Sequence, residues 1–153
     1  MTDTSGADTV DPAATDRRGL RVLGFEECLQ RLHDTPVGRV GFLRDGEVAI
    51  LPVNHVVDGM DIAFRTSWGS KLQTAADAGR VAFEVDGHDA TLATGWSVLV
   101  HGSAMIVYEA EDRQRLDDLA SKPWIPLDIN TFWVRIRPEE ITGREVLPPP
   151  AAP

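Results

Sequence analysis

The apolar residues of this chain follow two periods, one typical of helices and one typical of strands. Between residues 25 and 34 they recur at spacings of three and four, at Phe25, Cys28, Leu29 and Leu32. That spacing places the apolar side chains on one face of a helix. The pattern therefore predicts a short amphipathic helix near the start of the folded region.

The segment from residue 37 to 66 contains three apolar runs that are rich in β-branched residues. Asp45-Gly46 separates the first two runs, and Asp58-Gly59 separates the second from the third. Asp-Gly between such runs is a strong hairpin signal, because glycine accepts a positive φ. The segment is predicted to form a three-stranded antiparallel meander.

The remainder of the chain alternates between the two periods. Helices are predicted over "SKLQTAADAG" (70–79), ending at Gly79, and over "AEDRQRLDDLAS" (110–121). Strands are predicted over "RVAFEVDG" (80–87), over "GWSVLVHGSAMIVYE" (95–109) with a bend at Gly102, and over "TFWVRIRP" (131–138). Six strands joined mostly by hairpins favour a mainly β fold, an antiparallel barrel with small helices, since parallel strands would need crossover helices.

The length of 153 residues and the 42% hydrophobic content predict one domain of ordinary size. We place this domain at residues 20–146. Residues 1–19 are dominated by small and acidic side chains, and they are predicted to be a disordered tail. Residues 147–153, "LPPPAAP", are predicted to be a proline-rich tail.

The net charge of -9 argues against a nucleic-acid-binding surface or an anchor to an anionic membrane, because both need a positive field. No apolar run reaches the roughly 18 residues that span a bilayer. The single cysteine, Cys28, cannot form an internal disulfide, and it lies on the apolar side of the first predicted helix. These features predict a soluble cytoplasmic protein with a buried thiol.

Motifs for covalent or metal catalysis are missing from the sequence. No G-x-S-x-G elbow presents a serine nucleophile, and no H-x-x-x-H or C-x-x-C spacing supplies paired metal ligands. The histidines are scattered, at His33, His55, His88 and His101. We therefore predict no metal site, and we assign no catalytic residue.

The stretch "FRTSWGSKL" (64–72) is dense in groups that bind anions. Thr66 and Ser70 offer hydroxyls, Arg65 and Lys71 offer positive charge, and Gly69 allows a close approach of the backbone. The helix predicted to follow would add the amides of its N-terminus. The spacing alone leaves two interpretations open: a phosphate site, or an ordinary helix capped by a serine.

A second informative run is "ILPVNHV" (50–56). Pro52 cannot donate to a β-ladder and is expected at an edge or a bulge, while Asn54 and His55 place polar side chains in an otherwise apolar strand. A flat ligand lying along this strand would satisfy those groups. An irregular edge strand with a half-exposed His55 explains the run equally well. Tryptophans at or near strand ends and loops often line pockets or interfaces, and the chain has four, Trp68, Trp96, Trp124 and Trp133.

Four segments together carry a family resemblance: "PVNHVVDGMDIAFRTSWGSKL", "RVAFEVDG", "GWSVLVHG" and "RIRPEEITGREV". In order and spacing they resemble the pyridoxamine 5′-phosphate oxidase-like family of flavin-binding split-barrel proteins. The branch that they resemble most is that of small actinobacterial flavin-nucleotide-binding proteins, which is also similar to nitroimidazole-resistance reductases. The resemblance covers nearly all of residues 20–146.

The resemblance implies a six-stranded antiparallel split β-barrel that forms a homodimer, with FMN in each of two clefts between the subunits. It assigns the cofactor to residues of the two polar runs, of the "GWS" segment and of the partner chain. These are Pro52, Val53, Asn54 and His55 beside the flavin ring, Phe64, Arg65, Thr66, Ser70 and Lys71 at the phosphate, Trp96 and Ser97 nearby, and Trp124 and Arg144 from the partner.

The sequence departs from the oxidase itself at two motifs. The R-x-x-x-L-K flavin strand of that enzyme is replaced by "AILPVNHV", and its C-terminal arginine-histidine substrate motif has no counterpart in "ITGREVLPPP". The expected function is therefore that of a flavin-dependent oxidoreductase acting on another small substrate. Two alternatives stay open: a deazaflavin-dependent reductase, or a non-catalytic flavin- or haem-binding module in which His55 or His101 ligates iron.

Overall fold

The computed structural model describes residues 14–120 and 130–150 of the chain. Its three helices within these ranges are α1 (Phe25–Asp34), α2 (Lys71–Ala78) and α3 (Ala110–Leu119). Its strands are β1 (Arg21–Leu23), β2 (Val37–Arg44), β3 (Glu47–Asp58), β4 (Asp61–Ser67), β5 (Arg80–Asp89), β6 (Thr94–Ile106) and β7 (Thr131–Val146). No helix in the described part of the chain is long and apolar enough to cross a membrane.

All strand pairings are antiparallel, and the sheet closes on itself. The strand order is β1-β7-β4-β3-β2-β5-β6, with an additional pairing between β7 and β6 that completes the ring. The predicted barrel and its six strands, β2 to β7, are confirmed. The seventh strand, β1, has only three residues, too few to show a period, and it pairs with the far end of β7 through Arg21 and Glu145.

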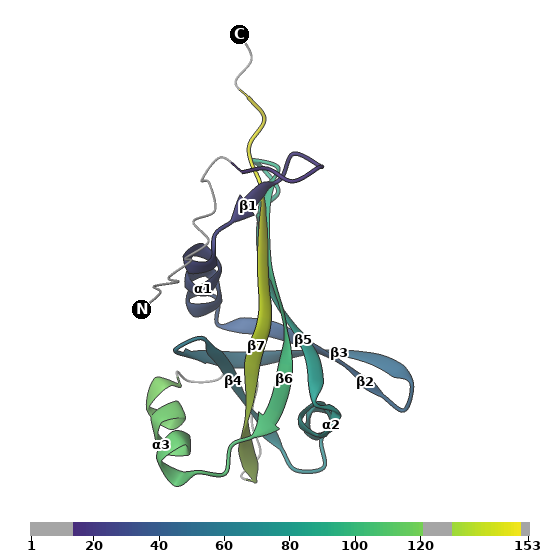
Figure 1. Ribbon diagram of the computed structural model, residues 1–153, viewed down its shortest axis with the longest axis vertical. Coiled ribbons are helices and arrows are strands. Elements are labelled where there is room, and N and C mark those ends of the chain that lie inside the picture. The colour runs from purple at the N-terminus through teal and green to yellow at the C-terminus, as the bar shows by residue number, and fades with distance from the viewer. Residues whose placement is uncertain (1–13, 121–129, 151–153) are drawn as a thin grey trace, which may run out of the picture.

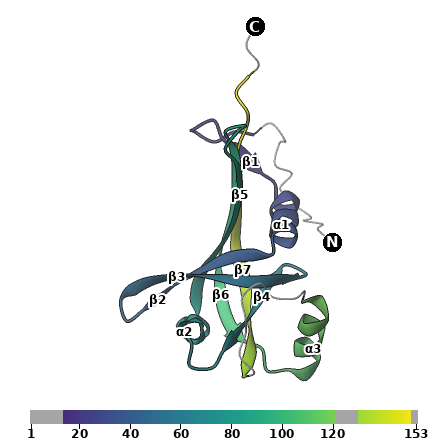
Figure 2. The same cartoon turned by 180° about the vertical axis from the view of Figure 1, so that it is seen from behind.

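The hairpin turns match their sequence signals. Asp45 and Gly46 both have positive φ, 50° and 80°, between β2 and β3. The β2–β3 hairpin that they close projects away from the rest of the molecule, to the right in Figure 1 and to the left in Figure 2. Residues 47–54 of β3 pair with β2 and not with β4, so Pro52 lies on a half of the strand with one free edge, as predicted.

The bend predicted at Gly102 is a shift of register between β6 and β7. The pairing moves between His101 and Gly102, and Pro138 faces Gly102 at this irregularity. A Cβ atom at position 102 would collide with the carbonyl oxygen of Arg137. Because the irregular ladder accommodates the proline, β7 continues to Val146 and is longer than the strand predicted over 131–138.

The helices lie on different sides of the barrel. α1 and α3 lie on one side of the long β7 strand, and α2 lies on the other (Figures 1 and 2). Cys28 of α1 is buried in the main core, as predicted, together with Leu32. A smaller apolar cluster beneath α3 contains Leu116 and Trp133.

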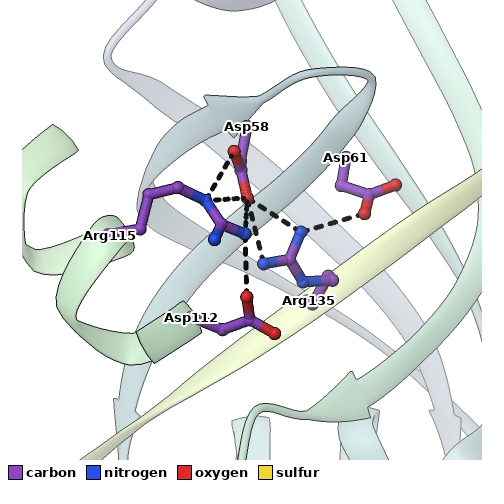
Figure 3. A network of polar contacts seen from close by, with 5 residues as sticks. All are labelled: Asp58, Asp61, Asp112, Arg115 and Arg135. Atoms are coloured by element: carbon purple, nitrogen blue, oxygen red, sulfur yellow. Dashed lines mark hydrogen bonds and ion pairs between the residues drawn. The ribbon is translucent and has the colours of Figure 1, made fainter. Parts of the chain in front are cut away.

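A network of charged side chains ties α3 to the barrel (Figure 3). Asp58, at the end of β3, accepts hydrogen bonds from Arg115 of α3 at 2.9 Å and from Arg135 of β7 at 3.0 Å. Arg135 also donates to Asp61 at 2.9 Å, and Arg115 pairs with Asp112 of its own helix. Trp133 adds a further contact, because its Nε1 donates to the carboxylate of Asp117 in α3 at 2.8 Å.

Candidate functional site

A cavity of about 220 Å³ opens beside the barrel where β3, β4, the start of α2 and the end of α3 meet. Strand pairing brings two of its lining residues together, because Arg65 of β4 lies opposite Trp133 of β7. The cavity is lined by Pro36, Pro52, Val53, Asn54, His55, Val56, Arg65, Thr66, Ser67, Ser70, Leu72, Ala120 and Trp133. Both polar runs singled out in the sequence therefore contribute to one pocket.

Thr66 and Ser70 form a pair of hydroxyls at the start of α2. Their Oγ1 and Oγ atoms lie 2.7 Å apart, and Thr66 is buried. Ser70 occupies the N-cap position of α2, yet its hydroxyl makes no capping hydrogen bond to a backbone N–H of the helix. The sequence left open a phosphate site or a helix capped by a serine side chain. The structure does not contain that serine cap. The first turn also lacks acidic residues, so its positive dipole end is not neutralised from within the helix.

Arg65 supplies the positive charge of the pocket. Its Nη2 donates to Thr131 Oγ1 at 2.6 Å, and its guanidinium carbon lies 5.7 Å from the centre of the Trp133 ring. Among residues 14–120 and 130–150, no carboxylate forms an ion pair with Arg65 and no Asp or Glu lines the cavity. An arginine that is held in place but not neutralised can bind an external anion such as a phosphate.

His55 is a buried imidazole in the wall of the pocket. Its Nε2 lies 2.8 Å from the carbonyl oxygen of Leu32, so Nε2 carries the proton and donates, and Nδ1 is an acceptor. Nδ1 is buried and has no hydrogen-bond partner among the described residues. Burial lowers the pKa of His55, and the bond to Leu32 opposes this only in part.

The other residues of the β3 run line the opening. Asn54 donates from Nδ2 to the carbonyl oxygen of Pro36 at 3.4 Å. Pro52 and Val53 precede it on the half of β3 that does not pair with β4. Among the described residues no strand pairs with this edge of β3, and Pro52 itself carries no backbone N–H.

The remaining predicted cofactor residues lie elsewhere. Phe64 is fully buried in the core, and Lys71 is exposed outside the cavity lining. Trp96, Ser97 and Arg144 line a second hollow near the far end of β7, away from Trp133. Trp124 lies outside the described residues. A single chain therefore brings together seven of the predicted residues, Pro52, Val53, Asn54, His55, Arg65, Thr66 and Ser70.

The second hollow is built around Trp96. The guanidinium of Arg31 lies 4.6 Å from the centre of the Trp96 ring, and a Cβ atom at Gly87 would approach that ring to 2.7 Å. Arg144 pairs with Asp16 at 3.2 Å. Here the arginine is already neutralised within the chain, unlike Arg65 in the first pocket.

Sequence reasoning missed several lining residues. Ser67 stands within the donor-rich loop and could have been named from its composition. Trp133 was noted only as one of four tryptophans that could line a pocket, and Pro36 gave no signal, because both come from distant segments. Only the β4–β7 register, in which Trp133 lies opposite Arg65, places that tryptophan in the wall.

A closed antiparallel sheet with a ligand-sized pocket at its side defines the split-barrel class of proteins. Within that class, the chain belongs to the pyridoxamine 5′-phosphate oxidase family, whose profile matches residues 25–145. The family resemblance stated from the sequence is thereby confirmed.

Individual relatives support this assignment. The chain is 40% identical over 131 residues to the uncharacterized protein Rv0080 of Mycobacterium tuberculosis, covering 82% of this chain and 84% of the relative. The FAD-binding protein of Mycobacterium smegmatis superimposes with a TM-score of 0.72 at 36% identity, covering 82% of this chain and 99% of that one. The conserved protein DIP1874 of Corynebacterium diphtheriae, of unknown function, does so with a TM-score of 0.70 at 32% identity, covering 90% and 100%.

Proposed function

We propose that the pocket beside Arg65 binds a flavin and that the chain serves as a flavin-dependent oxidoreductase for a small substrate. The observation that carries the proposal is that Arg65, which no carboxylate of the described residues neutralises, shares the cavity with the Thr66–Ser70 hydroxyl pair at the start of α2, where Ser70 makes no side-chain cap. These groups suit a phosphate, and the β3 segment from Pro52 to His55, which lines the same cavity, suits a flat ring. A bound flavin would supply hydride and electron transfer, while the protein positions the ring.

FMN and FAD both contain the flavin ring and the first phosphate, which are the groups that this pocket is proposed to bind. FMN is the cofactor implied by the family resemblance. FAD is the second candidate, because the Mycobacterium smegmatis relative is named as an FAD-binding protein.

Other cofactors receive less support from the geometry. A deazaflavin coenzyme carries a long anionic tail, and the net charge of -9 disfavours it outside the one cationic pocket. In a haem-binding module His55 would have to ligate iron through Nδ1, because Nε2 donates to Leu32, and Nδ1 is buried. His101 is half exposed and lies 3.7 Å from Glu140, outside the pocket lining.

We further propose that a second copy of the chain completes the cofactor site. The support is the separation of the predicted cofactor residues into two hollows near opposite ends of β7. A partner chain could bring Trp96, Ser97 or Arg144 to a pocket that one chain alone leaves open. It would also cover the apolar surface of the projecting β2–β3 hairpin.

The phosphate site is tested by replacing Arg65 with Ala and titrating FMN and riboflavin by calorimetry. A charge-assisted hydrogen bond contributes about 1.5 to 3 kcal/mol. We therefore expect the dissociation constant for FMN to rise roughly 10- to 150-fold. Riboflavin lacks the phosphate, so its dissociation constant should change little.

Arg80→Ala is the matched control, because Arg80 is exposed and pairs with Glu139 away from the pocket. This control should bind FMN like the wild type. Unchanged FMN affinity in Arg65→Ala would contradict the phosphate assignment, and absence of flavin binding by the wild type would overturn the proposal as a whole.

A further inference from the structure

Helix α3 rests on a surface that continues into the wall of the pocket beside Arg65. Of the ten described residues of this helix, only Leu116 is buried. Leu116 packs in the smaller apolar cluster, which is separate from the main core. Three residues of this cluster or packed against it, Val56, Ala120 and Trp133, also line the pocket. A movement of α3 away from the barrel would therefore change the wall of the pocket.

Trp133 connects α3 to the positive charge of the pocket. At the edge of its ring, Nε1 donates to the carboxylate of Asp117 in α3 at 2.8 Å. The guanidinium carbon of Arg65 lies over the ring, 5.7 Å from its centre, which is within the range of a cation–π interaction. Thr131 Oγ1 accepts a hydrogen bond from Arg65 on β7 as well. The orientation of Arg65 thus depends in part on a tryptophan that α3 holds.

The hydrogen bond to Asp117 restricts the indole of Trp133 to one orientation. The ring is only 5% exposed, so water has little access to its N–H. A buried donor that loses its acceptor carries a cost in free energy, and a charged acceptor makes the stronger bond. If α3 leaves the barrel, Trp133 loses this acceptor, and Arg65 loses a ring with a fixed position.

We propose that Asp117 is a positioning residue for the pocket, and that docking of α3 on the barrel and binding of a flavin favour each other. Asp117 is not part of the pocket lining, and it acts by holding Trp133, which in turn holds Arg65 where a phosphate can bind. The inference rests on the proposed flavin site and extends it to a helix outside that site. Coupling between two sites is reciprocal, so a bound flavin must stabilise the docked helix by the factor with which the docked helix raises the flavin affinity.

The first test measures the dissociation constants of FMN and riboflavin for the wild type and for Asp117→Ala. Loss of a cation–π contact corresponds to a change of roughly 2- to 30-fold. We expect FMN to bind Asp117→Ala more weakly by a factor in this range. Riboflavin has no phosphate for Arg65 to bind, so its dissociation constant should change by a smaller factor.

Two further variants make the result specific. Asp118→Ala removes the same charge from the next residue of α3, where the carboxylate accepts from Gln114 within the helix at 3.0 Å. This control should bind FMN and riboflavin like the wild type. Asp117→Asn keeps an oxygen that can accept from Trp133 Nε1 and should retain most of the FMN affinity, which separates loss of this hydrogen bond from loss of folding.

The second test measures amide hydrogen exchange in residues 110–119 with and without saturating FMN. If FMN favours the docked helix, exchange of these amides should be slower in the presence of FMN, for the wild type and for Asp118→Ala. In Asp117→Ala the effect of FMN on this exchange should be smaller, because the connection through Trp133 is lost.

The outcomes separate this inference from the proposal on which it rests. If the wild type binds neither FMN nor riboflavin, the flavin site fails and the inference fails with it. If FMN binds the wild type and Asp117→Ala equally well, or does not slow exchange in α3, the coupling is overturned while the flavin site stands. If Asp117→Ala weakens FMN and riboflavin by the same factor, Asp117 does not act through Arg65, and its positioning role is overturned.

Discussion

At the scale of single residues, His55 shows how the barrel stabilises a neutral imidazole. The side chain is 8% exposed, it packs edge-on against Phe83 at 4.9 Å, and it donates to Leu32. Burial lowers its pKa in the folded state, so the unfolded chain binds a proton more readily near neutral pH. The free energy of unfolding must therefore decrease as the pH falls below the ordinary histidine value of about 6.5.

We expect His55 to contribute a slope of up to about 1.4 kcal/mol per pH unit below about pH 6.5. Urea unfolding followed by circular dichroism between pH 5 and 8 measures this slope. His55→Gln can still donate to Leu32 but does not titrate, so its slope should be shallower. His88→Gln, at an exposed position, should keep the slope of the wild type. Equal slopes in wild type and His55→Gln would show that His55 does not titrate differently in the two states.

Only some of the pocket residues could be predicted from the sequence. Arg65, Thr66 and Ser70 could be named because they are contiguous in one loop, and local composition records such clusters. The burial of His55 could not be predicted, because it depends on the position of α1. The carbonyl of this helix that bonds His55 lies 23 residues away in the sequence. Trp133 was recognised only as one of four tryptophans near strand ends or loops, since its place in the wall depends on strand pairing.

At the scale of elements, the network of charged side chains around Asp58 connects α3 to the barrel (Figure 3). Arg115, followed by Arg135, holds the pKa of Asp58 below its ordinary value, although burial opposes this. The stabilisation is therefore present at neutral pH and is lost as the pH falls below about 4. Arg135 is the buried member of the network, so losing its partner leaves a charge with few alternatives.

Asp58→Asn should lower the free energy of unfolding by roughly 1.5 to 3 kcal/mol, the range for hydrogen bonds to charged groups. Chemical denaturation at pH 7 measures the loss. Asp112→Asn removes the exposed pair with Arg115 and one of the two first-turn carboxylates of α3, both surface interactions of less than about 1 kcal/mol, and should stay closer to the wild type. If the two variants have equal stability, the network does not hold α3 to the barrel.

The elements themselves were largely predictable, because their signals are local. The Asp45-Gly46 turn and the apolar periods locate the hairpins and helices directly. Two features were not foreseen: β1, and the extension of β7 beyond Pro138. Both depend on the partner strand, since a three-residue segment has no period and a proline ends a strand unless an irregular pairing accommodates it.

At the scale of the whole molecule, one face of the barrel carries exposed apolar side chains on neighbouring strands. Leu43 and Val48 pair across the β2–β3 hairpin, and Ile50 lies two residues further on the same face. Exposed fractions of 61%, 73% and 65% show that nothing in the described residues covers them. Leu99 of β6 belongs to the same face, because Arg39 pairs with Glu84 and Glu84 pairs with Leu99.

We call these four residues, Leu43, Val48, Ile50 and Leu99, the hairpin face, and we expect a second copy of the chain to cover it. Sedimentation velocity should give a species of twice the chain mass for the wild type. Val48→Glu places a charge at the most exposed residue of the face and should shift the species to monomer. Because the proposed cofactor site needs the partner chain, the same variant should also weaken flavin binding.

Leu92→Glu adds the same charge at an equally exposed leucine outside the hairpin face, in the turn between β5 and β6. This control should sediment as a dimer and bind flavin normally, which excludes added negative charge as the cause of any loss. A monomeric wild type that binds flavin fully would contradict the shared site, because one chain would then suffice. A dimer that persists in Val48→Glu would instead place the interface on another surface and leave the hairpin face free for a different partner.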